Sequence, residues 1–290
     1  MRLLIIGGTK SIGPHVVRQL LSVGNEVAVY HRGENESPLP AAVRHFHSPL
    51  AAMPVLHFPK AVVDYEPDVL IHMIPMGEAD AKAAVEAFRG VARRIIAVSS
   101  CDVYRAYGRF LGIESGDTEP APVNEDSPVR TVLFPYRRVE TPREALEYSY
   151  EKIVMEQTVL SDDRIPGTVL RLAKVYGPSN NGACGTMYGF RNYPNWRWTH
   201  SYVENVAAAI VLAASDSRAN GRIYNVGEEH TPTVAERLSQ LPPSDAPALH
   251  DLPYNFEQHL VFDSGRIRHE LGYSELVDCQ EGIRRTFTTT

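Results

Sequence analysis

Short apolar runs alternate with stretches of helical periodicity through the first two-thirds of the 290-residue chain. Near-continuous apolar runs are typical of strands buried on both faces, because a half-exposed strand would alternate polar and apolar positions. We expect strands at 3–6, 26–30, 42–46, 67–74, 93–100 and 167–173, of which 42–46 is the weakest. Helical patterns at 13–23 and 80–89 separate them. The order predicts an α/β fold with a doubly wound, Rossmann-type parallel sheet.

Two segments break this rhythm. The stretch 104–143 is rich in Pro, Gly and charge, and 177–198 is irregular as well. Loops of this length in a compact domain are usually functional or mobile. The C-terminal part contains a proline-rich link at 242–247 and two short helix candidates at 264–271 and 280–287.

This organisation predicts two parts of unequal size. Residues 1–176 and 203–226 are expected to form the nucleotide-binding Rossmann domain. Residues 177–202 and 227–290 are expected to form a smaller C-terminal lobe that binds the substrate.

Composition narrows the class of protein. The formal net charge of −6 gives no electrostatic reason to expect nucleic acid or an anionic membrane as the main partner. No apolar stretch approaches the length of a membrane span. The cysteines Cys101, Cys184 and Cys279 show no Cys-x-x-Cys spacing, which argues against structural zinc or a disulfide framework. We therefore expect a cytoplasmic protein with no metal and a small-molecule substrate.

The segment "LLIIGGTKSIG" joins the first strand to the first helix through closely spaced glycines. Such a turn lets the backbone approach a pyrophosphate, and the helix N-terminus supplies unpaired N–H groups. The alternative is a tight strand–helix turn without a ligand. The binding interpretation assigns to the cofactor Gly7, Gly8, Thr9, Lys10, Ser11, Ile12 and Gly13.

The segment "EYSYEKIVMEQTVL" contains Tyr148 four residues before Lys152. Residues four apart on a helix share a face, so the hydroxyl and the ammonium group are expected to point the same way. A Tyr-x-x-x-Lys match is short enough to occur by chance, and Tyr150 is an alternative for the tyrosine that faces a cleft.

Four further motifs occur in an informative order, and they are "VSSCDVY", "LRLAKVYGP", "THSYVENVAAAI" and "DSGRIRHELGY". Together with the glycine turn they resemble the NAD(P)-dependent epimerase/dehydratase family, in the extended or atypical branch of the short-chain dehydrogenase/reductase superfamily. The resemblance covers most of the chain. It places the Tyr148 segment between the Ser-Ser strand and the Val-Tyr-Gly-Pro strand, where this family has its Tyr-x-x-x-Lys helix.

The resemblance implies a set of catalytic residues. Tyr148 would exchange a proton with a substrate hydroxyl or carbonyl, and Lys152 would favour the tyrosinate and bind the nicotinamide ribose. Ser100 would hydrogen-bond the same substrate oxygen, next to Ser99 in the cofactor site. Asp102 is a candidate second acid or base, and a loop anchor is the alternative.

The resemblance also bears on cofactor choice. His31 occupies the usual place of the acidic ribose ligand and Arg32 follows it, while Lys10 replaces the middle glycine of the loop. Arginine suits a 2′-phosphate, so NADP is favoured over NAD. The segment "FHSP", with His47 and Ser48, stands where the family commonly has an Asp that holds the adenine.

The loop "RNYPNWRW" lies where relatives build the substrate pocket. Aromatic rings and arginines suit a sugar and a phosphate, as in a nucleotide sugar, and packing is the alternative. The substrate candidates are Arg191, Tyr193, Trp196 and Arg197.

The sequence therefore favours an NAD(P)-dependent epimerase or dehydratase acting by hydride transfer on a nucleotide sugar or related metabolite. A simple carbonyl reductase is one alternative. Another is an atypical member without turnover that senses NAD(P) or binds RNA. The resemblance also makes a homodimer plausible, since many relatives pair through helices that include the Tyr-x-x-x-Lys helix.

Overall fold

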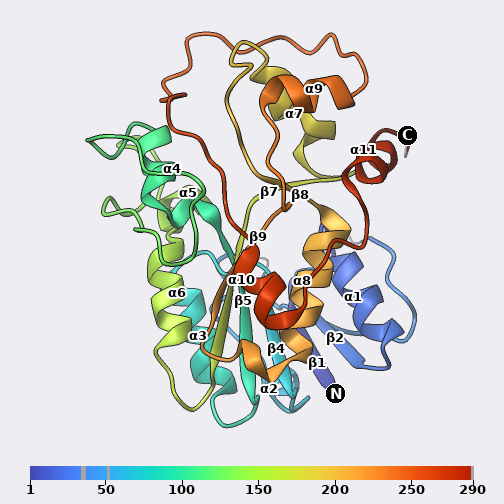
Figure 1. Ribbon diagram of the computed structural model, residues 1–290. Helices are drawn as coiled ribbons and strands as arrows, with labels where there is room; N and C mark the ends of the chain where they lie inside the picture. The colour runs from blue at the N-terminus through green and yellow to red at the C-terminus, as the bar shows by residue number, and fades with distance from the viewer. Residues whose placement is uncertain (34–36, 51–52, 289–290) are drawn as a thin grey trace. The chain divides into compact units, whose positions relative to one another are not determined.

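The computed structural model describes residues 1–33, 37–50 and 53–288. Its main sheet has seven strands in the order β3-β2-β1-β4-β5-β6-β9 (Figure 1). Their bounds are β1 Arg2–Ile6, β2 Glu26–His31, β3 Arg44–His47, β4 Val69–His72, β5 Arg94–Ser100, β6 Gly167–Leu172 and β9 Ile223–Val226. The pairs from β3 through β5 are parallel. The predicted doubly wound α/β fold is confirmed.

Helices connect the strands, and the helices predicted at 13–23, 80–89, 264–271 and 280–287 are present within a few residues of those ranges. The α-helices are α1 Gly13–Ser22, α2 Lys60–Val63, α3 Glu78–Phe88, α4 Arg105–Phe110, α5 Leu146–Ser149, α6 Lys152–Leu160, α7 Asn181–Gly189, α8 Val203–Ser215, α9 Val234–Gln240, α10 Gly265–Leu271 and α11 Cys279–Thr288. Across the described residues, none of the helices is long and apolar enough to cross a membrane.

Contacts divide the chain into two compact units. The first unit contains 1–100, 133–171 and 207–223, and the second contains 101–132, 172–206 and 224–290. The division differs from the predicted lobes chiefly at 101–132, a segment that clusters with the second unit.

The core of the first unit explains why its strands are apolar on both faces. Leu4 and Ile6 of β1 belong to a buried cluster that also includes residues of α2, α3 and α6. The α3 and α6 helices contact each other and lie along one side of the sheet, while α1 and α8 lie along the other (Figure 1). Two covered faces are what near-continuous apolar strands require.

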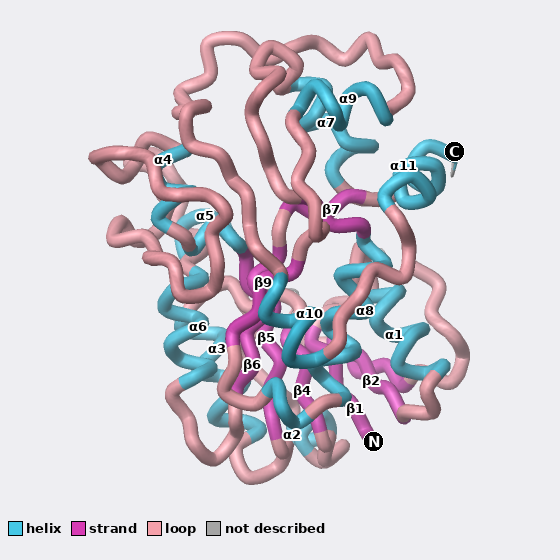
Figure 2. The backbone as a smooth tube through the Cα atoms, viewed as in Figure 1, coloured by secondary structure: helices cyan, strands magenta, loops and turns pink. Residues whose placement is uncertain are grey.

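The second unit contains a separate two-stranded parallel sheet, β7 Lys174–Tyr176 and β8 His200–Tyr202. The α7 helix lies within the stretch that was predicted to be irregular, so that prediction is wrong. The chain between α9 and α10 is a long loop, as predicted for its proline-rich part (Figure 2).

The helix predicted around Tyr148 is interrupted. The one-turn α5 ends at Ser149, Tyr150 has an extended backbone, and α6 begins at Lys152 (Figures 1 and 2). Glu151 is the N-cap of α6, and its carboxylate accepts a hydrogen bond from the Ile153 N–H at 2.9 Å. The prediction that Tyr148 and Lys152 share one helix face is therefore wrong, because a capped helix start lies between them.

Candidate functional site

The glycine turn has the backbone geometry that close approach of a ligand requires. Gly7 and Gly8 have φ values of +90° and +87°, which favour glycine. A Cβ at Gly13 would lie 2.3 Å from Gly8 Cα, so the start of α1 packs directly on the turn. The N-cap of α1 makes no side-chain cap hydrogen bond, and its first turn carries no acidic residue. The helix N-terminus is thus suited to an anion.

A cavity of about 540 Å³ in the first unit adjoins this turn. Residues 7–12 of the predicted cofactor set line it, together with His31 and Arg32 at the end of β2. Gly13 does not line the cavity but supports it through Gly8. The residues present fit a dinucleotide, with the pyrophosphate at the α1 N-terminus and the adenosine toward β2.

Several lining residues were not predicted from the sequence, and they are Tyr30, Ser48, Met53, Val55, Met73, Ile74, Glu144 and Leu146. Met73 and Ile74 follow β4 directly, so the rule that ligands bind at the carboxyl ends of parallel strands would have found them. Glu144 lies just before α5 and Leu146 is its first residue, and no sequence signal identified them.

Lys152 lies in the first turn of α6 and is 6% exposed. Its ammonium group donates hydrogen bonds to the carbonyl of Pro75, after β4, and to that of Val98 in β5 at 3.2 Å. These carbonyls hold the charge near the carboxyl ends of two neighbouring strands. Burial and, secondly, the charge of Lys152 lower the pKa of His72 to about 3, so the His72 imidazole is neutral.

The two tyrosines have different surroundings. The Lys152 Nζ atom lies 5.4 Å from the centroid of the Tyr150 ring. The Tyr148 ring is covered instead by Arg137, whose guanidinium carbon is 4.2 Å from the ring centroid and whose Nε donates to the Tyr148 carbonyl at 2.8 Å. Tyr150 is therefore the tyrosine next to the lysine ammonium, and the catalytic assignment of either residue stays a prediction.

The serines at the end of β5 differ in orientation. Ser99 is 3% exposed, and its hydroxyl donates to Glu156 at 2.5 Å. Glu156 in turn binds Arg171, with 2.7 Å between Oε2 and Nη2. Ser99 belongs to this buried network and does not line the cavity, whereas Ser100 is half-buried at the carboxyl end of the strand. Asp102, in a short 3-10 turn at Cys101–Val103, is buried.

In the second unit, three of the four predicted substrate residues take part in packing. Trp196 is 2% exposed and stacks on Phe110, with 4.9 Å between ring centroids. Tyr193 stacks on Phe256. The Arg191 guanidinium donates to backbone carbonyls, including that of Tyr188 at 2.8 Å. These contacts are of the kind that the packing alternative describes, and the assignment of the three residues to the substrate stays a prediction.

Arg197 differs from these three. It lines a cavity of about 430 Å³ in the second unit, next to His259 and Asp263. One of its nitrogens donates to the Thr231 carbonyl at 2.8 Å.

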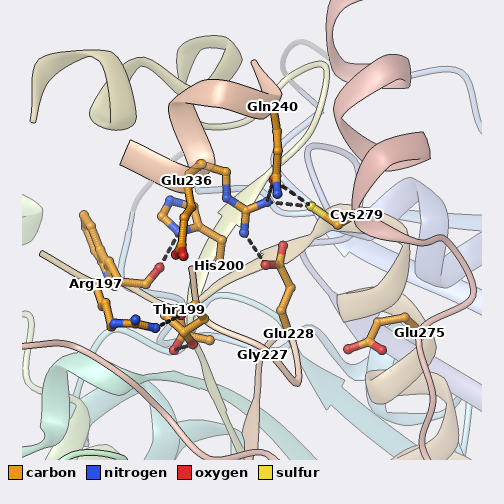
Figure 3. Close-up of polar contacts among 12 residues, drawn as sticks. Arg197, Thr199, His200, Gly227, Glu228, Glu236, Gln240, Glu275 and Cys279 are labelled. Carbon is orange, nitrogen blue, oxygen red and sulfur yellow. Dashed lines mark hydrogen bonds and ion pairs between the residues drawn. The ribbon is translucent and has the colours of Figure 1, made fainter. Parts of the chain in front are cut away.

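A second cavity of the same unit, of about 560 Å³, is markedly acidic. Its carboxylates are Glu228, Glu229, Glu236, Glu275 and Asp278. Arg237 forms an ion pair with Glu228 and donates to the Cys279 sulfur at 2.6 Å. Figure 3 labels Glu228, Gln240 and Cys279 of this cavity. Burial raises the pKa of Glu228, against the opposing effect of Arg237.

Comparison with known proteins agrees with this geometry. The family model described as the NAD dependent epimerase/dehydratase family matches residues 3–227. The chain belongs to this family. The family resemblance expected from the motifs is thus confirmed.

One curated protein is distantly similar to this chain in sequence. The 2'-dehydrokanamycin reductase of Streptomyces kanamyceticus is 24% identical over 247 residues, which are 79% of this chain and 62% of that protein. The chain thus spans less than two thirds of that relative.

Solved structures share the family fold over nearly the whole chain. The UDP-glucose 4-epimerase of Thermotoga maritima, solved with UDP-glucose, has a TM-score of 0.72 and 17% identity, covering 99% of this chain and 97% of its own. The UDP-glucose 4-epimerase of Thermus thermophilus, solved with NAD, has a TM-score of 0.67 and 22% identity at the same coverage.

Proposed function

We propose that the protein is an NAD(P)-dependent oxidoreductase of the epimerase/dehydratase type, acting on a hydroxyl or carbonyl carbon. The observation that carries the proposal is the close packing of Gly13 on Gly8, which brings the α1 N-terminus to the wall of the nucleotide-sized cavity. The bound nicotinamide would supply or accept the hydride.

The chain's own charges favour NADP over NAD. Lys10 and Arg32 are exposed and line the cavity together with His31. A guanidinium can bind a phosphate through two parallel hydrogen bonds. A ribose 2′-hydroxyl would instead be matched by a carboxylate, and the usual position of that carboxylate holds His31.

Proton transfer would use the residues near the ends of β4 and β5. The Lys152 ammonium, held by two backbone carbonyls, favours the tyrosinate form of a neighbouring phenol by its charge. Tyr150 is the better placed proton donor, because its ring lies against Lys152, and Tyr148 remains the sequence-based alternative. Ser100, at the end of β5, would hydrogen-bond the substrate oxygen.

For the substrate, the solved relatives with UDP-glucose favour a nucleotide sugar. A second candidate is simple reduction of a carbonyl in a cationic metabolite. The acidic cavity of the second unit favours a positively charged ligand, and one relative is named as a reductase. In that case NADPH would be consumed stoichiometrically, whereas an epimerase would retain its cofactor and restore the oxidised form by returning the hydride to the substrate.

The first experiment is a fluorescence titration with NADPH and NADH. Arg32→Ala and Lys10→Ala should each reduce the preference for NADPH, and Lys82→Ala, an exposed lysine on α3, serves as the control. Binding of neither cofactor by the folded wild-type protein would refute the proposal.

Turnover is tested next, with UDP-sugars and with amino-substituted ketones, by product analysis and NADPH absorbance. Tyr150→Phe should abolish turnover while leaving cofactor affinity in place, and Tyr148→Phe should retain most of it. The reverse result would return the acid/base role to Tyr148. Equal activity in both variants would exclude the proton-transfer scheme.

A further inference from the structure

Three histidines meet at the edge of the main sheet, where β2 pairs with β3. The parallel register sets His31 opposite His47 and Val29 opposite His45. Paired residues, and residues two apart on one strand, lie on the same face of a sheet. His31, His45 and His47 therefore project from one face. One ring nitrogen of each lies within 4.8 Å of those of the other two.

The cluster is held in a defined orientation. The Gly33 N–H donates to His31 Nδ1 at 3.1 Å, so this nitrogen carries no proton and the ring proton is on Nε2. That Nε2 faces His45 Nδ1 at 2.9 Å. The His31 and His47 rings meet edge to face, with 4.7 Å between centroids. The arrangement combines one buried, one half-buried and one exposed imidazole, so it is ordered and also open to solvent.

A dinucleotide site alone does not explain this set. The sequence departs from the family at His31, in place of an acidic residue, and at His47, near the usual adenine ligand. The structure shows that these two departures are neighbours and that His45 completes a group with them. His45 does not line the nucleotide cavity.

We propose that His31, His45 and His47 bind one divalent transition-metal ion of the zinc class. Neutral imidazole is a preferred ligand of zinc, cobalt, nickel and copper, and three such ligands leave a further position for water or an anion. The ring nitrogens all lie within 4.8 Å of one another. Two ligands about 2.0–2.1 Å from zinc lie within about 4.2 Å of each other, so small side-chain rotations bring the three nitrogens to the spacing that a shared ion needs.

Coordination through His31 Nε2 has a local consequence. A neutral imidazole has one ring proton, so this proton moves to Nδ1 when the metal occupies Nε2. Nδ1 then no longer accepts from Gly33, whose N–H must turn to another acceptor. The Gly33 amide is therefore a reporter of metal binding that lies outside the ligand set.

The test uses full-length protein with any affinity tag removed, treated with EDTA and dialysed. Titration with Zn²⁺ by calorimetry, and with Co²⁺ by visible absorption, should show one ion per chain. His45→Gln and His47→Gln should each weaken binding by roughly tenfold or more, the scale expected for a damaged metal site. His269→Gln, an exposed histidine on α10, is the matched control and should leave binding unchanged.

Two results would overturn the assignment: the absence of stoichiometric binding, or binding that persists in both cluster variants. A nitrogen–proton correlation spectrum of the wild type provides a measurement independent of variant folding. A Zn²⁺-dependent shift of the Gly33 amide is expected, and an unmoved amide at saturating Zn²⁺ would also refute the site. No cofactor is present in these measurements, so their failure would leave the proposed oxidoreductase function untouched.

Discussion

Replacement of Gly13 by alanine tests how the first helix supports the cofactor turn. The added Cβ would lie 2.3 Å from Gly8 Cα and 2.4 Å from its carbonyl carbon. Both contacts are with backbone, so no flexible side chain can move aside, and α1 has to shift by roughly 1 Å to restore normal contact. Overpacking of this kind costs about 1–3 kcal/mol of unfolding free energy.

The same displacement moves the N–H groups of the α1 N-terminus away from the cavity. We expect the Kd for NADPH to rise about tenfold or more. This corresponds to a loss of about 1.4 kcal/mol of binding free energy, which lies within the range given for the overpacking. Urea unfolding measures the stability change, and fluorescence titration measures the affinity.

Gly185→Ala in α7 is the matched control. A Cβ at Gly185 meets nothing within 4 Å, so alanine there should be neutral or stabilise by about 0.5–1 kcal/mol. If Gly13→Ala unfolds and binds NADPH like this control, the turn and the helix are not coupled as described.

Further predictions concern buried polar groups and a helix cap. Glu156→Ala should lower the free energy of unfolding in urea by about 3–5 kcal/mol, because the Arg171 side chain, only 4% exposed, loses its carboxylate partner. A loss below about 1 kcal/mol would contradict this prediction. Burial lowers the pKa of both His72 and His200 to about 3, below the ordinary value of 6.5. As pH falls below about 6.5, these histidines take up protons in the unfolded chain before they do so in the folded protein. Each of them should therefore lower the free energy of unfolding by about 2 kcal/mol by about pH 5. Equal urea midpoints at neutral pH and at that acidic pH would refute this prediction. Thr233→Ala should remove the N-cap of α9 and cost about 1 kcal/mol, measurable as a lower melting temperature.

The sequence alone was enough to predict six strands of the main sheet, because burial on both faces imposes apolar runs that few other structures share, whereas β9 was not predicted. Even the weak run at 42–46 corresponds to β3, at Arg44–His47. The missed α9 had a readable signal, since Thr233 and Glu236 form a capping box at its start. The α7 helix had none as clear, because glycines occur within it and its polar and apolar residues do not segregate.

The candidate site was only partly predictable. Residues of the glycine turn were found because the turn and the helix start are continuous in sequence. The break between Tyr148 and Lys152 was not, since it depends on Glu151, whose carboxylate also accepts from the Phe134 N–H in the irregular segment. Likewise, His31 and His47 were noted separately, and only the strand register brings them together.

The break before Lys152 has a consequence for how such a protein can be altered. Lys152 starts a helix whose Ile153 and Met155 are anchored in the buried interior, whereas the two tyrosines belong to the preceding segment. The lysine ammonium group and the tyrosine hydroxyls therefore belong to two separate segments of the chain. Variation in the length or composition of 133–150 would reposition the tyrosines while leaving the lysine fixed, so a library confined to that segment could change substrate range without rebuilding the scaffold.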